Sequence, residues 1–154
     1  APIGDESLFF CPADELIVVA QQAAYDLWTG TMVGPDGQSA GGPIGDFAVA
    51  MVLAHEFAHH IQDELGLFGS ADTPIVEQHA DCLAGVWTAE AERVGILDPG
   101  DVEEGMTAAW LVGDSAVGSA DHHGTSEQRV AAFSTGYLGG QPAACDAYLV
   151  SGLA

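Results

Sequence analysis

The chain has 154 residues, of which 48% are hydrophobic, so it is long enough to bury a core and we expect a single domain over residues 1–154. Asp and Glu total 23 against two basic residues, and this net charge of −21 argues against binding to nucleic acid or anionic lipid. The sequence has no apolar run of transmembrane length and no signal peptide at its start, so we expect a processed chain.

The predicted elements begin with a strand at residues 16–19, where Leu-Ile-Val-Val is a short apolar, β-type run. Residues 20–28 then predict a helix, and the Gly- and Pro-containing segment 29–43 predicts a loop. With the helices described below, these elements predict a mainly α (α+β) fold with a small N-terminal β element.

A long helix follows, with Asp46 at its N-cap and an end near Leu65. It contains the H-E-x-x-H pattern, with histidines at His55 and His59. Because residues four apart lie one above the other on a helix, both imidazoles can reach one metal ion from the same side. Glu56 then lies beside the metal, where its carboxylate can accept a proton from a metal-bound water. The pattern alone also occurs by chance in proteins that bind no metal.

The next helix is predicted from Thr73 to Gly95 and carries Glu77 and Asp81, four residues apart. This arrangement resembles the gluzincin type of zinc enzyme, in which a glutamate on the following helix is the third ligand. An aspartate one turn later holds a ligating histidine there, which implies a bond between Asp81 and His55. The alternative is an ordinary solvated helix face, but the apolar surroundings make unpaired charge costly.

Other histidine patterns are less favourable. The metzincin pattern continues with H-x-x-G-x-x-H, whereas this chain has Gln62 and Leu65 at the glycine and third histidine positions. His60 points about 100° away from the neighbouring ligand on a helix, so we interpret it as lying beside the site or at the surface. His79 cannot reach the same point as Glu77 and is interpreted as a surface or loop-facing residue.

Two further helices are predicted. Asp98-Pro99 is typical of a helix start, and a helix ending near Gly113 explains this acidic segment better than a calcium site does. Thr125 and Gln128 form a capping box for a last helix that ends around residues 136–140.

His123 has two interpretations. Peptide hydrolysis needs a donor to the developing oxyanion, and enzymes of the gluzincin type often use a histidine from a later segment for this purpose. Alternatively, His122 and His123 are ordinary loop residues before the last helix. We interpret Arg129 as the partner of a buried carboxylate rather than as a substrate clamp.

The three cysteines divide unevenly. Cys82 lies in an apolar helix and is interpreted as a buried thiol. Cys11 and Cys145 lie near opposite ends of the chain, and we prefer a disulfide between them over two free thiols.

Together, five segments in one order resemble the bacterial family of "putative neutral zinc metallopeptidases": Phe9 to Asp14, Gly45 to Ala48, Ala54 to Gln62, Glu77 to Trp87, and His123 to Arg129. This resemblance implies a zincin-like domain with antiparallel metal-binding helices, one Zn²⁺ per chain and a location outside the cytoplasm. The chain departs from the family at Ala58, where glycine is usual, and at His79, where glutamine is usual.

Two functions remain open. The first is a zinc-dependent peptidase in which His55, His59 and Glu77 hold the metal, Glu56 is the general base and His123 assists catalysis. The alternative is a non-catalytic, zinc-containing structural subunit or accessory protein of a cell-envelope complex. The intact glutamate of H-E-x-x-H favours the peptidase, whereas the lack of a long second lobe to grip a peptide favours the subunit.

Overall fold

In a computed structural model of the chain, residues 3–67 and 73–153 are described. The elements in chain order are β1 (Leu8–Cys11), β2 (Leu16–Val19), α1 (Gln21–Thr29), α2 (Phe47–Glu64), α3 (Thr73–Arg93), α4 (Asp101–Leu111), α5 (Ser126–Gly139), the 3₁₀ helix η1 (Pro142–Cys145) and α6 (Asp146–Leu153). The fold is mainly helical with a small antiparallel β-hairpin near the N-terminus, which confirms the predicted fold class. None of the helices in these ranges is long and apolar enough to cross a membrane.

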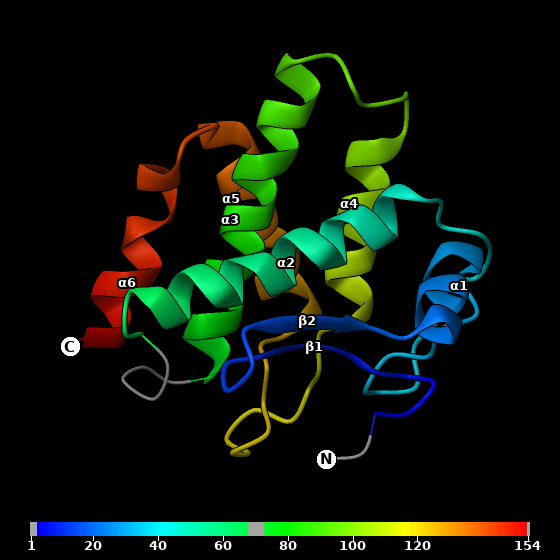
Figure 1. Ribbon diagram of the computed structural model, residues 1–154, viewed down its shortest axis with the longest axis horizontal. Coiled ribbons are helices and arrows are strands. Elements are labelled where there is room, and N and C mark those ends of the chain that lie inside the picture. Colours follow the sequence, from blue (N-terminus) through cyan, green and yellow to red (C-terminus); the bar gives the residue numbers. More distant parts are fainter. Residues whose placement is uncertain (1–2, 68–72, 154) are drawn as a thin grey trace.

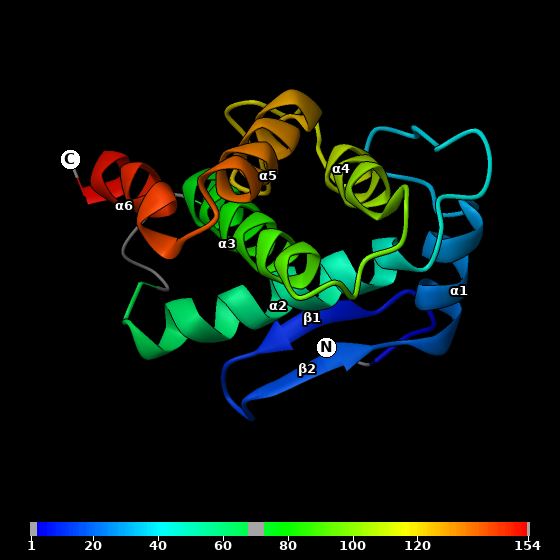
Figure 2. The same cartoon turned by 90° about the horizontal axis from the view of Figure 1, so that it is seen from above.

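The long helix α2 crosses the middle of the molecule, as Figure 1 shows. The β-hairpin lies on one side of α2, and α3, α4 and α5 lie on the other (Figure 2). Helix α3 rises steeply across α2, so the two helices cross rather than lie side by side along their lengths (Figure 1). The crossing brings one face of α2 against α3, and Phe47 of α2 stacks on Trp87 of α3.

The hydrophobic core lies where α2 meets the other helices. Its large buried side chains come from α1, α2, α4 and α5, and they are Leu27, Phe47, Met51, Leu111 and Phe133. Buried alanines on α2, α3 and α4 let the helices approach closely and exclude water from between them. The start of α2 is therefore anchored in this core.

The start of α2 is capped by a residue from another helix. Asp46 occupies the N-cap position as predicted, but its side chain makes no capping hydrogen bond. Instead, Phe47 N donates to Oε2 of Glu104 on α4, over 2.9 Å. Glu104 is 57 positions away from Phe47 in the sequence, so local sequence rules, which consider only neighbouring residues, could not identify it as the capping residue.

The acidic segment 98–104 does contain a helix start, but it lies two residues later than predicted. Helix α4 begins at Asp101 with Gly100 as its N-cap, and Asp98 N donates to Oδ2 of Asp101. At α5, Thr125 and Gln128 form the full capping box, and Gly140 ends the helix in the left-handed conformation. The short strand β1, which pairs with β2 in antiparallel register, was not predicted.

The predicted disulfide was wrong. Cys145 pairs with Cys82, which is fully buried in α3, and Cys11 is a free cysteine whose Sγ donates to Asp14. The bridge ties η1 to α3, so the C-terminal segment packs against α3 rather than against the N-terminal hairpin. Neither η1 nor α6 was predicted.

Helices α3 and α5 touch through their backbones. A methyl group at Gly85 would overlap with the carbonyl oxygen of Phe133, and one at Gly136 would overlap with that of Cys82. Glycine at both positions therefore allows a closer approach than any other residue would permit.

Candidate metal centre

One face of α2 carries the H-E-x-x-H residues. His55, Glu56 and His59 are all buried, with exposed fractions of 6–8%. The two imidazoles lie one helical turn apart, with ring centroids 4.6 Å from each other and the rings nearly perpendicular. The helical spacing alone therefore aims two nitrogen ligands into the same space.

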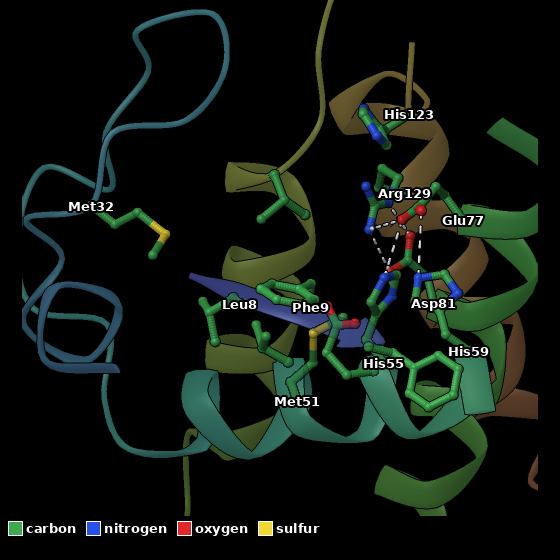
Figure 3. A pocket seen from close by; sticks show the side chains of 14 residues that line it. Leu8, Phe9, Met32, Met51, His55, His59, Glu77, Asp81, His123 and Arg129 are labelled. Atoms are coloured by element: carbon green, nitrogen blue, oxygen red, sulfur yellow. Dashed lines mark hydrogen bonds and ion pairs between the residues drawn. The ribbon is translucent and has the colours of Figure 1, made fainter. Parts of the chain in front are cut away.

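Glu77 meets these histidines from α3. Its Oε2 lies 3.1 Å from Nε2 of His55, and its Oε1 lies 3.4 Å from Nε2 of His59. Ligand atoms bound tetrahedrally to Zn²⁺ at 2.0–2.1 Å are separated by about 3.3 Å, which is close to these two distances, each to a different oxygen of Glu77. The three residues, shown in Figure 3, thus form a group that can hold a metal ion.

Asp81 links this group to a buried arginine. Its Oδ1 accepts from Nδ1 of His55 over 2.9 Å, and its carboxylate also accepts from Nε and Nη2 of Arg129. Asp81 is fully buried and Arg129 nearly so, which confirms that Arg129 is the partner of a buried carboxylate. The Nη2 atom of Arg129 also lies 3.3 Å from Oε2 of Glu77. Two carboxylates therefore share one permanent positive charge.

These charges govern the ionisation of the group. Burial alone would lower the pKa of His55, but the carboxylates of Asp81 and Glu77 outweigh it and raise that pKa to about 10. Burial would raise the pKa of Glu77, yet its hydrogen bonds to both histidines and the charge of Arg129 hold it well below its usual range. In the metal-free protein, a proton on His55 therefore occupies the place that a cation would take.

The second histidine has an uncharged partner. Gln62 Nε2 donates to the carbonyl of Val76 over 2.8 Å, which can only accept, so the amide oxygen faces His59. Nδ1 of His59 lies 2.7 Å from that oxygen and donates to it. Nε2 is consequently the atom of His59 that faces Glu77 and could ligate a metal.

Gln62 also reaches a third histidine. Its Nε2 lies 2.9 Å from Nδ1 of His79, which is buried, so the interpretation of His79 as a surface residue was wrong. Burial lowers the pKa of His79 and favours the neutral ring that can accept from the amide. Sequence reasoning missed Gln62, although it lies three residues after His59 and so on the same helix face.

The metal group opens into a cavity of about 390 Å³. Glu56 lines this cavity, and so does His123, whose side chain is 48% exposed. Figure 3 places His123 near Arg129 at one side of the cavity. The structure thus brings Glu56, the three candidate ligands and His123 to one space.

The loop that carries His123 is held by Asp114. Its carboxylate accepts from Nδ1 of His122 and from the backbone N of His123 and of Ala116. Although burial would raise the pKa of Asp114, these bonds lower it to about 2. The predicted loop is therefore tightly organised, and its buried member is His122 rather than His123.

Comparisons with known proteins agree with this geometry. The family described as "Putative neutral zinc metallopeptidase" matches residues 4–148. The chain is 32% identical over 163 residues to the protein YpfJ of Escherichia coli K12, covering 91% of this chain and 53% of YpfJ. It is 31% identical over 173 residues to Mb2605 of Mycobacterium bovis and to Rv2575 of Mycobacterium tuberculosis H37Rv, covering 94% of this chain and 56% of each relative.

These relatives are themselves described as uncharacterized proteins. The chain spans about half the length of the curated relatives that it matches. No solved structure matches the chain.

Proposed function

Because the chain belongs to the family of "putative neutral zinc metallopeptidases", we propose that it is a zinc-dependent peptidase, a hydrolase that cleaves peptide bonds with water. The observation that carries this proposal is the convergence of His55, His59 and Glu77 at ligand spacing, with Glu56 in the same cavity. A purely structural zinc site has four protein ligands and no open cavity, whereas this group has three protein ligands and faces one.

The roles of the residues follow from their contacts. His55, His59 and Glu77 would hold a zinc ion, which when bound would polarise the scissile carbonyl and lower the pKa of a water molecule. Glu56 is the general base in this proposal: its carboxylate would accept a proton from the attacking water and pass it to the leaving amine. Asp81 holds His55 in the tautomer that leaves Nε2 free for the metal.

His123 serves the carbonyl oxygen. It lies at the cavity wall, and its ring is half exposed, with Nδ1 3.8 Å from Oδ2 of Asp114. A hydrogen bond from this ring to the oxygen, strengthening as negative charge develops there, lowers the barrier to attack. Asp114 holds the backbone of this residue in place.

The partner is a peptide or protein, and the location is outside the cytoplasm. The Cys82–Cys145 disulfide supports such a location, because structural disulfides persist in oxidising compartments. The net charge of −21 repels nucleic acid.

The test combines metal content with peptide turnover. Pure protein is expected to contain one zinc per chain and to cleave members of a mixed peptide library, with loss of cleavage after chelation and recovery on adding zinc. His59→Ala is expected to lose stoichiometric zinc. Glu56→Gln, which is nearly isosteric, is expected to keep zinc and lose cleavage.

Glu64→Gln, a change of the same type at an exposed position of the same helix, is the matched control and is expected to retain both zinc and cleavage. If the protein holds one zinc but cleaves nothing in the library, the peptidase proposal fails and the non-catalytic subunit of a cell-envelope complex takes its place. If Glu56→Gln cleaves as fast as the parent, Glu56 is not the base.

A further inference from the structure

The cavity beside the metal group has two chemically distinct sides. His55, Glu77 and Arg129 lie on the polar side. The apolar side chains of the lining include Leu8 of β1, Met32 after α1, Met51 and Val52 of α2, and Val112 at the end of α4. Figure 3 shows Leu8, Met32 and Met51 lying away from Arg129 and His123.

The apolar side begins immediately next to the reacting groups. Met51 precedes His55, and Val52 precedes Glu56, by one helical turn, and all four residues line the cavity. One turn of helix rises about 5.4 Å, and consecutive residues of a peptide have Cα atoms about 3.8 Å apart. The residue next to a bond held at the metal group therefore has its side chain within reach of this wall.

The apolar side is preformed. Met51 and Val52 are buried, and Leu8, Met32 and Val112 are partly buried. Leu8 and Met32 also pack against the hydrophobic core, which holds them in place. Because these five side chains come from four separate segments, they enclose a space rather than a flat patch.

We propose that this apolar side is a specificity subsite that binds a large apolar side chain, such as Leu, Met or Phe, on a residue adjacent to the scissile bond. The proposal rests on the proposed peptidase function and names its substrate class. A buried Leu or Phe side chain is favourable against such a wall, whereas a charged side chain would lose its hydration among residues that offer no polar side-chain partner.

The first experiment measures binding without turnover. N-acetyl amino-acid hydroxamates chelate zinc through one end and differ only in the side chain presented to the cavity. With the zinc-loaded protein, titration calorimetry is expected to show Leu and Phe hydroxamates binding at least about 10-fold more tightly than the Gly compound, and the Asp compound more weakly than Gly. Equal affinities across the four compounds would overturn the subsite.

Two variants locate the effect. Val112→Phe fills the space and is expected to weaken binding of the Leu and Phe hydroxamates by about 10-fold or more. The affinity of the Gly hydroxamate is expected to change by less than about 3-fold. Met32→Ala enlarges the space and is expected to raise the affinity of the Phe hydroxamate relative to that of the Leu hydroxamate. Val117→Phe is the matched control, because Val117 is 74% exposed and lies outside the cavity. If Val112→Phe and Val117→Phe behave alike, the subsite lies elsewhere.

Hydrolysis then separates this proposal from the one on which it rests. If hydroxamate affinity depends on the side chain but no peptide is cleaved, the subsite proposal stands and the peptidase proposal is overturned. If peptides are cleaved with no preference for apolar residues on either side of the bond, the peptidase proposal stands and the subsite proposal is overturned. Sequencing of the products from a peptide library shows which side of the bond the subsite serves.

Discussion

The Oδ1 atom of Asp81 lies 2.9 Å from Nδ1 of His55, and the Asp81 side chain has no exposure to solvent. The alternative of a solvated acid on a helix surface is therefore wrong for this residue. Because Nδ1 donates to this carboxylate, Nε2 is the atom of His55 that could ligate a metal once its own proton is displaced.

Asp81→Asn is expected to weaken zinc binding by about 10–100-fold, because the neutral amide no longer stabilises the ligating imidazole or balances Arg129. Zinc dissociation measured against a competing chelator gives the affinity. Thr88→Ala is the control for general destabilisation, since Thr88 is buried on the same helix and bonds only locally, to the Ala84 carbonyl. Equal zinc affinity in Asp81→Asn and the parent protein would contradict the role of Asp81.

Gln62→Leu is expected to loosen zinc by about tenfold or more, because His59 loses the acceptor that orients its ring. Gln62→Glu keeps an oxygen acceptor toward Nδ1 and is expected to bind zinc more tightly than Gln62→Leu. Gln141→Leu, at an exposed position, controls for the loss of an amide. Zinc affinity measured by chelator competition is expected to differ between the two Gln62 variants. Identical zinc affinities would mean that Gln62 only fills space.

Zinc affinity is expected to rise with pH. In the metal-free protein the pKa of His55 is about 10, so below that pH zinc must displace a proton from this residue. The low pKa of Glu77 keeps that ligand ionised at neutral pH and adds no further dependence. His55 alone therefore gives up to about a tenfold gain in affinity per pH unit between pH 6.5 and 9. Chelator competition at several pH values, corrected for the chelator's own protonation, checks this; a flat profile would contradict it.

The raised pKa of His55 also determines how the stability of the metal-free fold changes with pH. Protonated His55 stabilises that fold most below its unfolded pKa of about 6.5, and this contribution is lost as pH rises toward 10. Zinc-loaded protein is not expected to show this loss, because the metal replaces the proton.

His123→Ala is expected to lower kcat by about 10²-fold with zinc content unchanged, which is the usual effect of removing one oxyanion donor. Asp114→Ala removes the support of the same residue and is expected to cause a smaller loss. If Asp114 acts through His123, the double variant is no slower than His123→Ala alone. Asp121→Ala, at an exposed position of the same loop, serves as the control. Additive losses in the double variant would mean that Asp114 acts independently.

Features set by local spacing could be predicted from the sequence. The i, i+4 pairs at His55/His59 and Glu77/Asp81 indicated which side chains share a helix face, and these residues lie together in the structure. The capping box of α5 depends on two residues three positions apart and was likewise predictable.

Features that depend on distant partners could not be predicted. Local rules do not reveal that Glu104 caps α2, nor that Cys145 reaches Cys82 rather than Cys11. His79 was assigned to the surface because its angle on α3 excludes it from the metal, yet that angle directs it to Gln62. Each of these contacts follows from the crossing of helices, which single-sequence periodicity does not determine.

The backbone contact between α3 and α5 at Gly85 and Gly136 has a consequence for the metal centre. Helix α3 carries Glu77 and Asp81, whereas α5 carries Arg129, whose guanidinium contacts both of these carboxylates. The distance between the two helix axes therefore affects how strongly Arg129 stabilises the ionised carboxylates of the candidate metal group. Gly85 and Gly136, which have no side chains and do not line the cavity, therefore help to determine how closely the Arg129 guanidinium approaches Glu77 and Asp81.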